Sequence, residues 1–257
     1  MRVLITNDDG IASPGLRALV EAFEPVAEAY VVAPDRERSA TGHAITLHKP
    51  LRAHPVVLPG STVRAWATNG TPADCVALGM LGLLPARPEI VFSGINVGPN
   101  VARDLTYSGT VSGAMEGAIF GVPAVAISVA GFRDPLFTAA AAFAVALARL
   151  ILLHGLPEDV LLNVNVPNLP PERIAGVAIT RQSRRRYLSR LDRRLDPRGR
   201  TYYWLTGEPA DQEDEEGTDT WALARGQISV TPISLDMTDD RTAAALRRWN
   251  LTWPLPS

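Results

Sequence analysis

Hydrophobic residues in this chain form short, nearly continuous runs that alternate with longer amphipathic segments. Such short aliphatic runs are typical of strands buried on both faces. Two of the amphipathic segments open with a hydroxyl residue followed by proline, Ser13-Pro14 and Thr71-Pro72, which signals the start of a helix. We predict strands over 2–5, 29–33, 64–67, 89–92, 123–128 and 160–166, and helices over 14–23, 72–84, 111–120 and 136–154.

The alternation of strand and helix predicts the α/β class, with a mostly parallel, doubly wound sheet. In such a sheet, ligands bind along the rim at the carboxyl ends of the strands. The segment 136–154 is rich in alanine and carries Arg149, and Gly155 closes it. We interpret it as a buried amphipathic helix rather than a membrane span.

The composition changes beyond about Gly176. Residues 181–200 include nine arginines, and residues 209–219 are strongly acidic. Nucleic-acid contact is one interpretation of the basic run, but no aromatic stacking pattern accompanies it. We favour a projecting hairpin that pairs with a neighbouring subunit. We predict a catalytic core over 1–180 and an oligomerisation arm, returning strand, C-terminal helix and tail over 181–257, with strands at 202–205 and 227–233 and helices at 219–224 and 241–249.

Composition and charge narrow the classes of protein that the chain can represent. Its 257 residues are 46% hydrophobic, and the net charge of -2 gives no argument for nucleic-acid or membrane binding. The single cysteine, Cys75, lies in an apolar pattern and is expected to be buried and inert, and the four histidines lack paired zinc spacing. The first residues read directly as a strand, so we expect no signal peptide and a cytoplasmic protein.

Candidate chemistry begins at Thr6-Asn7-Asp8-Asp9-Gly10, directly after the first predicted strand. Past the end of a strand, with Gly10 free to turn, both carboxylates can point into one crevice. Two adjacent carboxylates repel each other, so they need a shared proton or a cation. A hard divalent ion with oxygen ligands satisfies the pair. A solvated turn that caps a helix is the structural alternative.

Further polar residues follow the other strands, at the same predicted rim. Ser39 follows the second strand, and Asn96 and Asn100 lie in a glycine-punctuated segment after the strand at 89–92. Asn96 can offer a neutral oxygen to a metal. Ser108 or Thr110 is expected to cap the helix at 111–120, whose free N–H groups form a phosphate site. Each of these residues also has an ordinary turn or cap role open to it.

Together these segments resemble the SurE family of stationary-phase survival proteins. The segments that carry the resemblance, in family order, are Thr6–Ile11, Ala33–Ser39, Gly70–Val76, Ser93–Asn96, Tyr107–Val111 and Gly217–Asp219. The resemblance implies a Rossmann-like core and a 5'-nucleotidase that releases phosphate from nucleoside 5'-monophosphates. It also implies one divalent cation per subunit, Mg or Mn, bound by Asp8, Asp9, Ser39 and Asn96. The resemblance further implies dimers or tetramers, with the late hairpin and C-terminal segment exchanged between subunits.

Our mechanistic hypothesis makes Asp8 and Asp9 the catalytic residues. Asp8 orients or deprotonates a water and Asp9 is mainly a ligand, although the sequence alone does not separate these two roles. Asn96, Asn100, Ser108, Gly109 and Thr110 are expected to hold the phosphate oxygens.

The alternatives are a non-catalytic nucleotide-binding module and a receiver-like, Mg-binding signalling module. Receivers are about half this length, and no matching phosphoacceptor aspartate and late lysine are visible. A haloacid-dehalogenase-type phosphatase needs Asp-x-Asp, whereas Asp8 and Asp9 are adjacent. No G-x-G-x-x-G follows the first strand, which argues against a dinucleotide dehydrogenase.

Overall fold

A computed structural model describes residues 1–185, 187–209, 215–249, 251 and 253. Among these residues, nine strands form one twisted sheet, and two further strands form a separate hairpin. In spatial order, the strands of the main sheet are β3 (Ala53–Val56), β4 (Arg64–Thr68), β2 (Glu28–Pro34), β1 (Arg2–Thr6), β5 (Ile90–Val97), β6 (Ala124–Ala130), β7 (Val160–Pro167), β11 (Ile228–Ser234) and β8 (Val177–Ile179). The run from β4 to β7 is parallel, whereas β3 and β11 pair antiparallel with β4 and β7.

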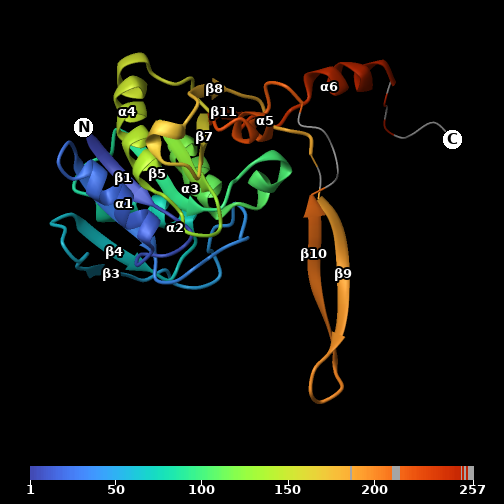
Figure 1. Cartoon of the computed structure of the whole chain (residues 1–257), viewed down its shortest axis with the longest axis horizontal. Helices are drawn as coiled ribbons and strands as arrows, with labels where there is room; N and C mark the ends of the chain where they lie inside the picture. The colour runs from blue at the N-terminus through green and yellow to red at the C-terminus, as the bar shows by residue number, and fades with distance from the viewer. Residues whose placement is uncertain (186, 210–214, 250, 252, 254–257) are drawn as a thin grey trace.

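Helices cover both faces of this sheet (Figure 1). One apolar cluster joins the sheet to α1 (Pro14–Phe23) and α4 (Thr138–His154), and a second joins it to α2 (Pro72–Leu78) and α3 (Gly109–Ile119). Burial of an apolar stripe on each helix stabilises this layered arrangement. The predicted α/β fold with a mostly parallel, doubly wound sheet is confirmed.

Local capping explains where the helices begin. The Ser13 Oγ accepts a hydrogen bond from the Leu16 N–H at 3.2 Å, and Pro14 is the first residue of α1. Thr71 and Asp74 form a reciprocal capping box at the start of α2. The helix predicted over 72–84 is α2 continued by a π-helical turn over Gly79–Leu83. Both predicted starts are confirmed.

One boundary prediction is wrong and matters for the site. We expected a loop after Phe92, but β5 continues to Val97, with a shift in its register between Ser93 and Asn96. Gly94 allows this continuation because a Cβ there would lie 2.3 Å from the carbonyl oxygen of Ile127 in β6. The strand therefore carries Asn96 at its carboxyl end instead of placing it in a free loop.

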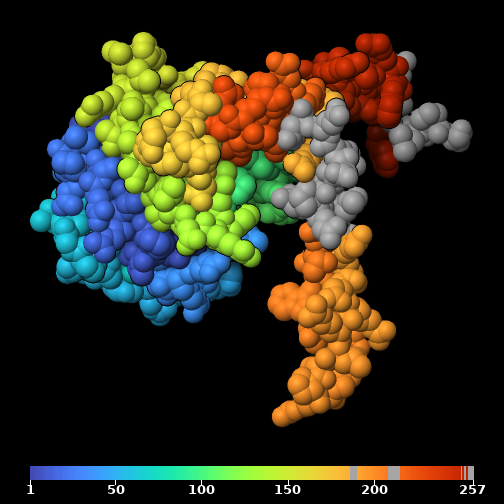
Figure 2. Space-filling model, in the orientation of Figure 1, coloured from blue at the N-terminus to red at the C-terminus, as the bar shows by residue number. Residues whose placement is uncertain are grey.

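The C-terminal part leaves the body and then returns to it. Strands β9 (Tyr187–Leu195) and β10 (Thr201–Pro209) form an antiparallel hairpin that projects clear of the sheet (Figures 1 and 2). The chain then adds α5 (Asp219–Ala224) beside the sheet and inserts β11 between β7 and β8. The projecting hairpin and the returning strand are confirmed. Much of the predicted acidic run, at 210–214, and Arg186 of the basic run lie outside the described residues.

The last helix, α6 (Asp240–Leu246), continues into a 3₁₀ turn at Arg247–Trp249 and buries none of its residues. Trp249 and Trp253 in the tail are both exposed, and the prolines near the end of the chain lie outside the described residues. In the part of the chain that the structure describes, no helix has the length and apolar character needed to cross a bilayer.

Candidate metal and phosphate site

The acidic turn after β1 is held in shape by its own side chains. The Asn7 Nδ2 donates to the Gly10 carbonyl at 3.0 Å and to the Ser13 Oγ at 2.7 Å. Gly10 has φ +96°, and a Cβ there would lie 3.0 Å from the backbone of Arg36. Only glycine fits this position without strain. The turn therefore directs Asp8 and Asp9 toward the rim of the sheet.

Asp8 lies against the N-terminus of α3. It is 5% exposed, and its Oδ1 accepts a hydrogen bond from the Thr110 Oγ1 at 2.5 Å. Gly109 makes this approach possible, since a Cβ there would lie 2.7 Å from the Cβ of Asp8. The positive end of the helix dipole favours the ionised carboxylate at this position. Asp8 is thus a buried carboxyl group with an oriented donor at one oxygen.

The two carboxyl groups are not easily ionised together. Burial raises the pKa of Asp8, while hydrogen bonds from Thr110 act in the opposite direction. Burial, followed by the negative charge of Asp8, raises the pKa of Asp9 to about 6. Glu37 also raises the pKa of both groups. The pair therefore concentrates negative charge that a cation would neutralise.

Ser39 reaches the site from the loop after β2. The Arg38 N–H donates to the Asp8 carbonyl at 2.7 Å, which ties this loop to the acidic turn. The Ser39 Oγ donates to the Glu37 carboxylate at 2.7 Å. Sequence reasoning missed Glu37, although it lies two residues before Ser39 in the same polar loop. Glu37 and Asp104 add two further carboxylates to the lining of the hollow.

Asn96 lies at the carboxyl end of β5, beside the acidic turn. Its Nδ2 donates to the carbonyls of Gly98 at 2.8 Å and Val97 at 3.3 Å. The amide nitrogen is therefore engaged by the backbone at the end of β5, and the side-chain oxygen is the end of the amide that can bind a cation. The role of Asn96 as a neutral oxygen ligand stays a prediction.

Asn100 is fixed by polar side chains from two neighbouring strands. Its backbone N–H donates to the Asn165 Oδ1 at 2.8 Å, and its carbonyl accepts from the Nδ2 of Asn163 and of Asn165. Its own Nδ2 donates to the Ser128 Oγ at 2.8 Å. Sequence reasoning missed these supporting residues. Their signal was the pair Asn163 and Asn165, two polar residues at alternate positions of an otherwise apolar, buried strand.

The predicted residues gather around one open hollow of about 500 Å³. Six of them line it, namely Asp8, Asp9, Ser39, Asn96, Asn100 and Ser108. The other two, Gly109 and Thr110, lie behind Asp8 in the first turn of α3. Ser108, rather than Thr110, caps this helix, because its Oγ accepts from the Val111 N–H at 3.1 Å.

The residues present suit a hard divalent cation. Asp9 Oδ2 is buried and has no hydrogen-bond partner, which is costly unless a cation or water binds it. Among the described residues, no three His, Cys, Asp or Glu side chains gather as a metal cluster. The predicted donor set of two carboxylates, a hydroxyl and an amide oxygen has the chemistry of a site for a hard, oxygen-binding cation.

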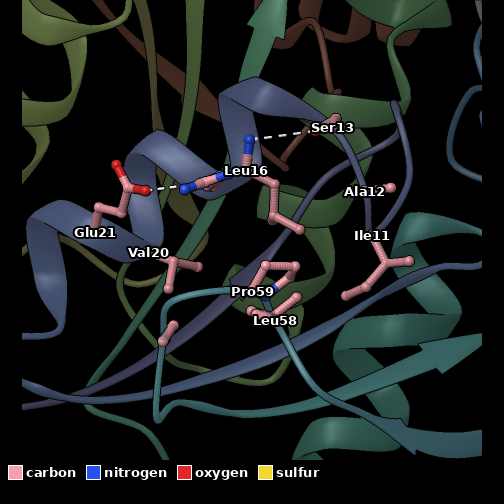
Figure 3. Close-up of a pocket in the computed structure, with 10 residues that line it drawn as sticks. Ile11, Ala12, Ser13, Leu16, Val20, Glu21, Leu58 and Pro59 are labelled. Carbon is pink, nitrogen blue, oxygen red and sulfur yellow. Dashed lines mark hydrogen bonds and ion pairs between the residues drawn. The ribbon is translucent and has the colours of Figure 1, made fainter.

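Two smaller features complete the neighbourhood. Cys75 is fully buried and burial raises the pKa of its thiol to about 12, which confirms the prediction of an inert thiol. A cavity of about 160 Å³ lies between α1 and the segment before β4 (Figure 3). It is lined by apolar side chains such as Leu16, Val20 and Leu58, and it shares no residue with the carboxylate hollow.

An acidic and amide-rich rim on a doubly wound sheet, facing a helix N-terminus, defines a Rossmann-like α/β protein suited to a phosphate and a divalent cation. The comparisons with known proteins agree. Residues 3–189 match the model of the family described as "Survival protein SurE". The chain belongs to the SurE family.

Relatives resemble the chain over nearly its whole length. It is 52% identical to the 5'-nucleotidase SurE of Heliobacterium modesticaldum, covering 97% of this chain and 92% of the relative. It is 50% identical to the 5'-nucleotidase SurE of Geotalea uraniireducens, covering 98% and 100%. The crystal structure of the SurE protein from Aquifex aeolicus is 42% identical and superposes with a TM-score of 0.85, covering 98% of this chain and 100% of that one.

Proposed function

We propose that the chain hydrolyses nucleoside 5'-monophosphates at a divalent-metal site formed by Asp8, Asp9, Ser39 and Asn96. The class of activity follows from the family, because the close relatives over the full chain are 5'-nucleotidases. SurE nucleotidases are generally metal-dependent, and we propose one Mg or Mn ion per subunit. The observation that supports this proposal most directly is the partnerless, buried Asp9 Oδ2 beside the ionisable Asp8.

A bound cation would polarise a phosphoryl oxygen and lower the pKa of an attacking water. The residues of the chain supply the remaining functions. Asp8 is oriented by the Thr110 hydroxyl, so one carboxylate oxygen is fixed and the other can orient the water or accept its proton. Asp9, with its raised pKa and its unpaired oxygen, serves mainly as a ligand.

We further propose that the phosphate lies between the Asn96–Asn100 segment and the start of α3. Ser108 lines this space and caps α3, so the positive dipole end of the helix, which Asp8 also faces, lies beside it. The Thr110 hydroxyl donates to Asp8, so Thr110 would orient Asp8 and would not bind the phosphate with its own Oγ1. Asn100 is held rigidly by β6 and β7, which preorganises the far side of the hollow.

The test is a phosphate-release assay over nucleoside monophosphates with Asp8→Asn. The substitution keeps the shape of the side chain but removes the charge, so turnover should fall by about a thousandfold or more. EDTA should abolish wild-type activity, and added Mn or Mg should restore it. Asp134→Asn is the matched control, because Asp134 is exposed and asparagine accepts its φ of 46°.

Near-normal hydrolysis by Asp8→Asn would contradict the assignment. Nucleotide binding without metal-dependent phosphate release would favour the non-catalytic alternative instead. Autophosphorylation by a small phosphodonor would favour the receiver-like alternative.

The remaining assignments concern the whole chain. We propose a catalytic core over residues 1–180 and an assembly region over 181–257, whose returning strand β11 completes the core sheet. We also propose that the chain forms a homodimer or homotetramer through the β9–β10 arm. The exposed Tyr203, Trp204 and Leu205 on β10 support this proposal. A cytoplasmic location stays a prediction from the sequence.

A further inference from the structure

Two exposed aromatic side chains, Tyr107 and Phe132, line the hollow that contains the carboxylates. Tyr107 is 68% exposed and Phe132 is 77% exposed, although both belong to a site whose other side chains are mostly polar. Large apolar side chains that stay exposed to water contribute little to the folding stability of the monomer. Their position at the mouth of the hollow therefore calls for a ligand or partner with an apolar face.

The ring of Phe132 is anchored on the loop that carries the proposed metal ligand Asn96. A Cβ at Gly98 would lie 2.3 Å from the Phe132 Cε1, so the ring occupies the space that this glycine leaves open. Gly98 has φ +99°, and its N–H donates to the Val129 carbonyl at 2.9 Å. One side of the ring thus rests on a fixed backbone, while most of the side chain remains open to solvent.

Tyr107 enters the hollow from the side of the proposed phosphate site. It ends the 3₁₀ helix Ala102–Tyr107 and directly precedes Ser108, the cap of α3. Its carbonyl accepts from the Gly42 N–H at 3.1 Å, which connects it to the loop that carries Ser39. Tyr107 is therefore adjacent in sequence to Ser108, and Phe132 contacts Gly98. Both Ser108 and Gly98 border the proposed phosphate position.

We propose that Phe132 and Tyr107 form the nucleobase subsite, in which Phe132 is the principal stacking surface. The inference rests on the proposed metal site. A nucleoside monophosphate has an anionic end, which the polar side of the hollow would bind, and a planar base with two π faces. Base–aromatic stacking tolerates every base, so this subsite predicts broad nucleotide specificity with a preference for the larger purines.

The apolar cavity beside α1 is the competing location for the base. It shares no residue with the carboxylate hollow, and its lining residues Arg17 and Glu21 form an ion pair at 2.7 Å (Figure 3). A base bound there would contact aliphatic side chains but no aromatic ring. A further hollow of about 370 Å³ is lined by Asp9 and Glu37 but likewise by no aromatic ring. The Phe132 side of the carboxylate hollow both adjoins the carboxylates and offers a stacking surface, so it is the better match.

The experiment compares a substrate that has a base with one that lacks it. The enzyme, loaded with Mn, is assayed with a purine nucleoside 5'-monophosphate and with ribose 5-phosphate. Phe132→Ala should lower kcat/KM for the nucleotide about 10- to 100-fold and leave that for ribose 5-phosphate within about twofold. Phe132→Leu should behave like Phe132→Ala, and Phe132→Trp should retain nucleotide hydrolysis. Leu153→Ala, an exposed apolar change on α4, is the control.

Product inhibition gives an independent measurement, because only one product carries the base. The inhibition constant of the nucleoside should rise in Phe132→Ala, whereas that of inorganic phosphate should not change. An equal loss on both substrates, or full nucleotide activity in Phe132→Leu, would overturn the inference. So would a nucleotide-specific loss in Leu58→Ala without one in Phe132→Ala.

Two controls distinguish a base subsite from a subunit contact and from the absence of a metal site. Light scattering should give the same molar mass for Phe132→Ala as for wild type, and a smaller mass would assign the ring to a subunit contact instead. Absence of metal-dependent hydrolysis of either substrate by the wild type would refute the proposed metal site rather than the base subsite alone.

Discussion

At the scale of single residues, the site is defined by charges that the protein does not neutralise by itself. Asp8 has an oriented hydroxyl donor, while Asp9 has a buried oxygen without a partner and a pKa raised to about 6. A folded protein retains such an arrangement when it serves function, since burying a charge without a partner is costly. The same feature makes metal binding depend on pH.

Metal affinity is therefore expected to fall as Asp9 becomes protonated. Each pH unit below about 6 should weaken Mn binding by about tenfold, because one proton must leave Asp9 for each ion bound. Above that pH the affinity should level off. Calorimetric titration with Mn between about pH 4.5 and pH 8, chosen to bracket this value, measures the slope.

The stability of the metal-free protein depends on pH in the opposite direction to metal affinity. The folded pKa of Asp9 lies above its ordinary value of 3.8, so the metal-free protein loses stability as pH rises from about 4 to 6. Asp9→Asn should remove this loss, melting higher than metal-free wild type above pH 6, and should also lose the stabilisation by Mn. A variant that melts lower and still binds Mn normally would contradict the ligand role.

At the scale of secondary-structure elements, the site loop is attached to the root of the arm. The Asp219 carboxylate at the start of α5 accepts from the Ala102 N–H at 2.8 Å and from the Ser183 N–H at 3.0 Å. The Gln182 Nε2 donates to the Ala102 carbonyl at 2.6 Å. Ala102 has φ 51° and lies two residues after Asn100, so these contacts stabilise an unfavourable backbone next to the hollow.

Replacing Asp219 by Asn should disturb this attachment. The amide cannot accept from all the N–H groups that the carboxylate now binds, and the fully buried position should lose about 2 kcal/mol of unfolding free energy. Activity of the folded variant should fall about tenfold as the Asn100–Tyr107 segment shifts. Urea unfolding and phosphate release measure the two effects.

Asp240→Asn serves as the control because Asp240 is exposed on α6. Unchanged activity in a measurably destabilised Asp219→Asn protein would show that this attachment supports the fold but not the site.

At the scale of the whole molecule, the body and the arm have different surfaces. The sheet and its helices enclose two apolar clusters, whereas the β9–β10 hairpin stands in solvent and exposes Leu191, Leu195, Trp204 and Leu205 (Figure 2). An isolated two-stranded hairpin is marginally stable in water. Exposed apolar residues on such an element fit burial against another subunit.

Trp204→Asp combined with Leu205→Asp should therefore reduce the size of the assembly. Charged side chains cannot be buried in an apolar contact without a large cost. Light scattering should report a dimer or tetramer for wild type and a smaller species for the variant. Thr206→Asp, an exposed change on the same strand, is the control. A monomeric wild type, or an unchanged mass in the variant, would contradict assembly through the arm.

The predictions that succeeded depended on local signals. Ser13-Pro14 and Thr71-Pro72 gave two helix starts, and the acidic turn after β1 marked the rim of the sheet. The end of β5 was predicted wrongly, because β5 continues past Gly94 only through its close approach to Ile127 in β6, a residue distant in the sequence. Ser128, Asn163 and Asn165 were missed because they contact Asn100 from distant parts of the sequence. Glu37 was missed although it lies two residues from Ser39 in the same loop.

The sequence by itself determined the α/β class, the family and most of the candidate ligands, because hydrophobic period, caps and adjacent carboxylates are all local properties. Tertiary structure decided which of these groups share one hollow, which oxygen of the pair lacks a partner, and that Phe132 rests on Gly98 beside the carboxylates. It also decided that β11 inserts antiparallel to β7, between β7 and β8. The physical reason is that burial, desolvation and long-range contacts arise only when distant segments pack together.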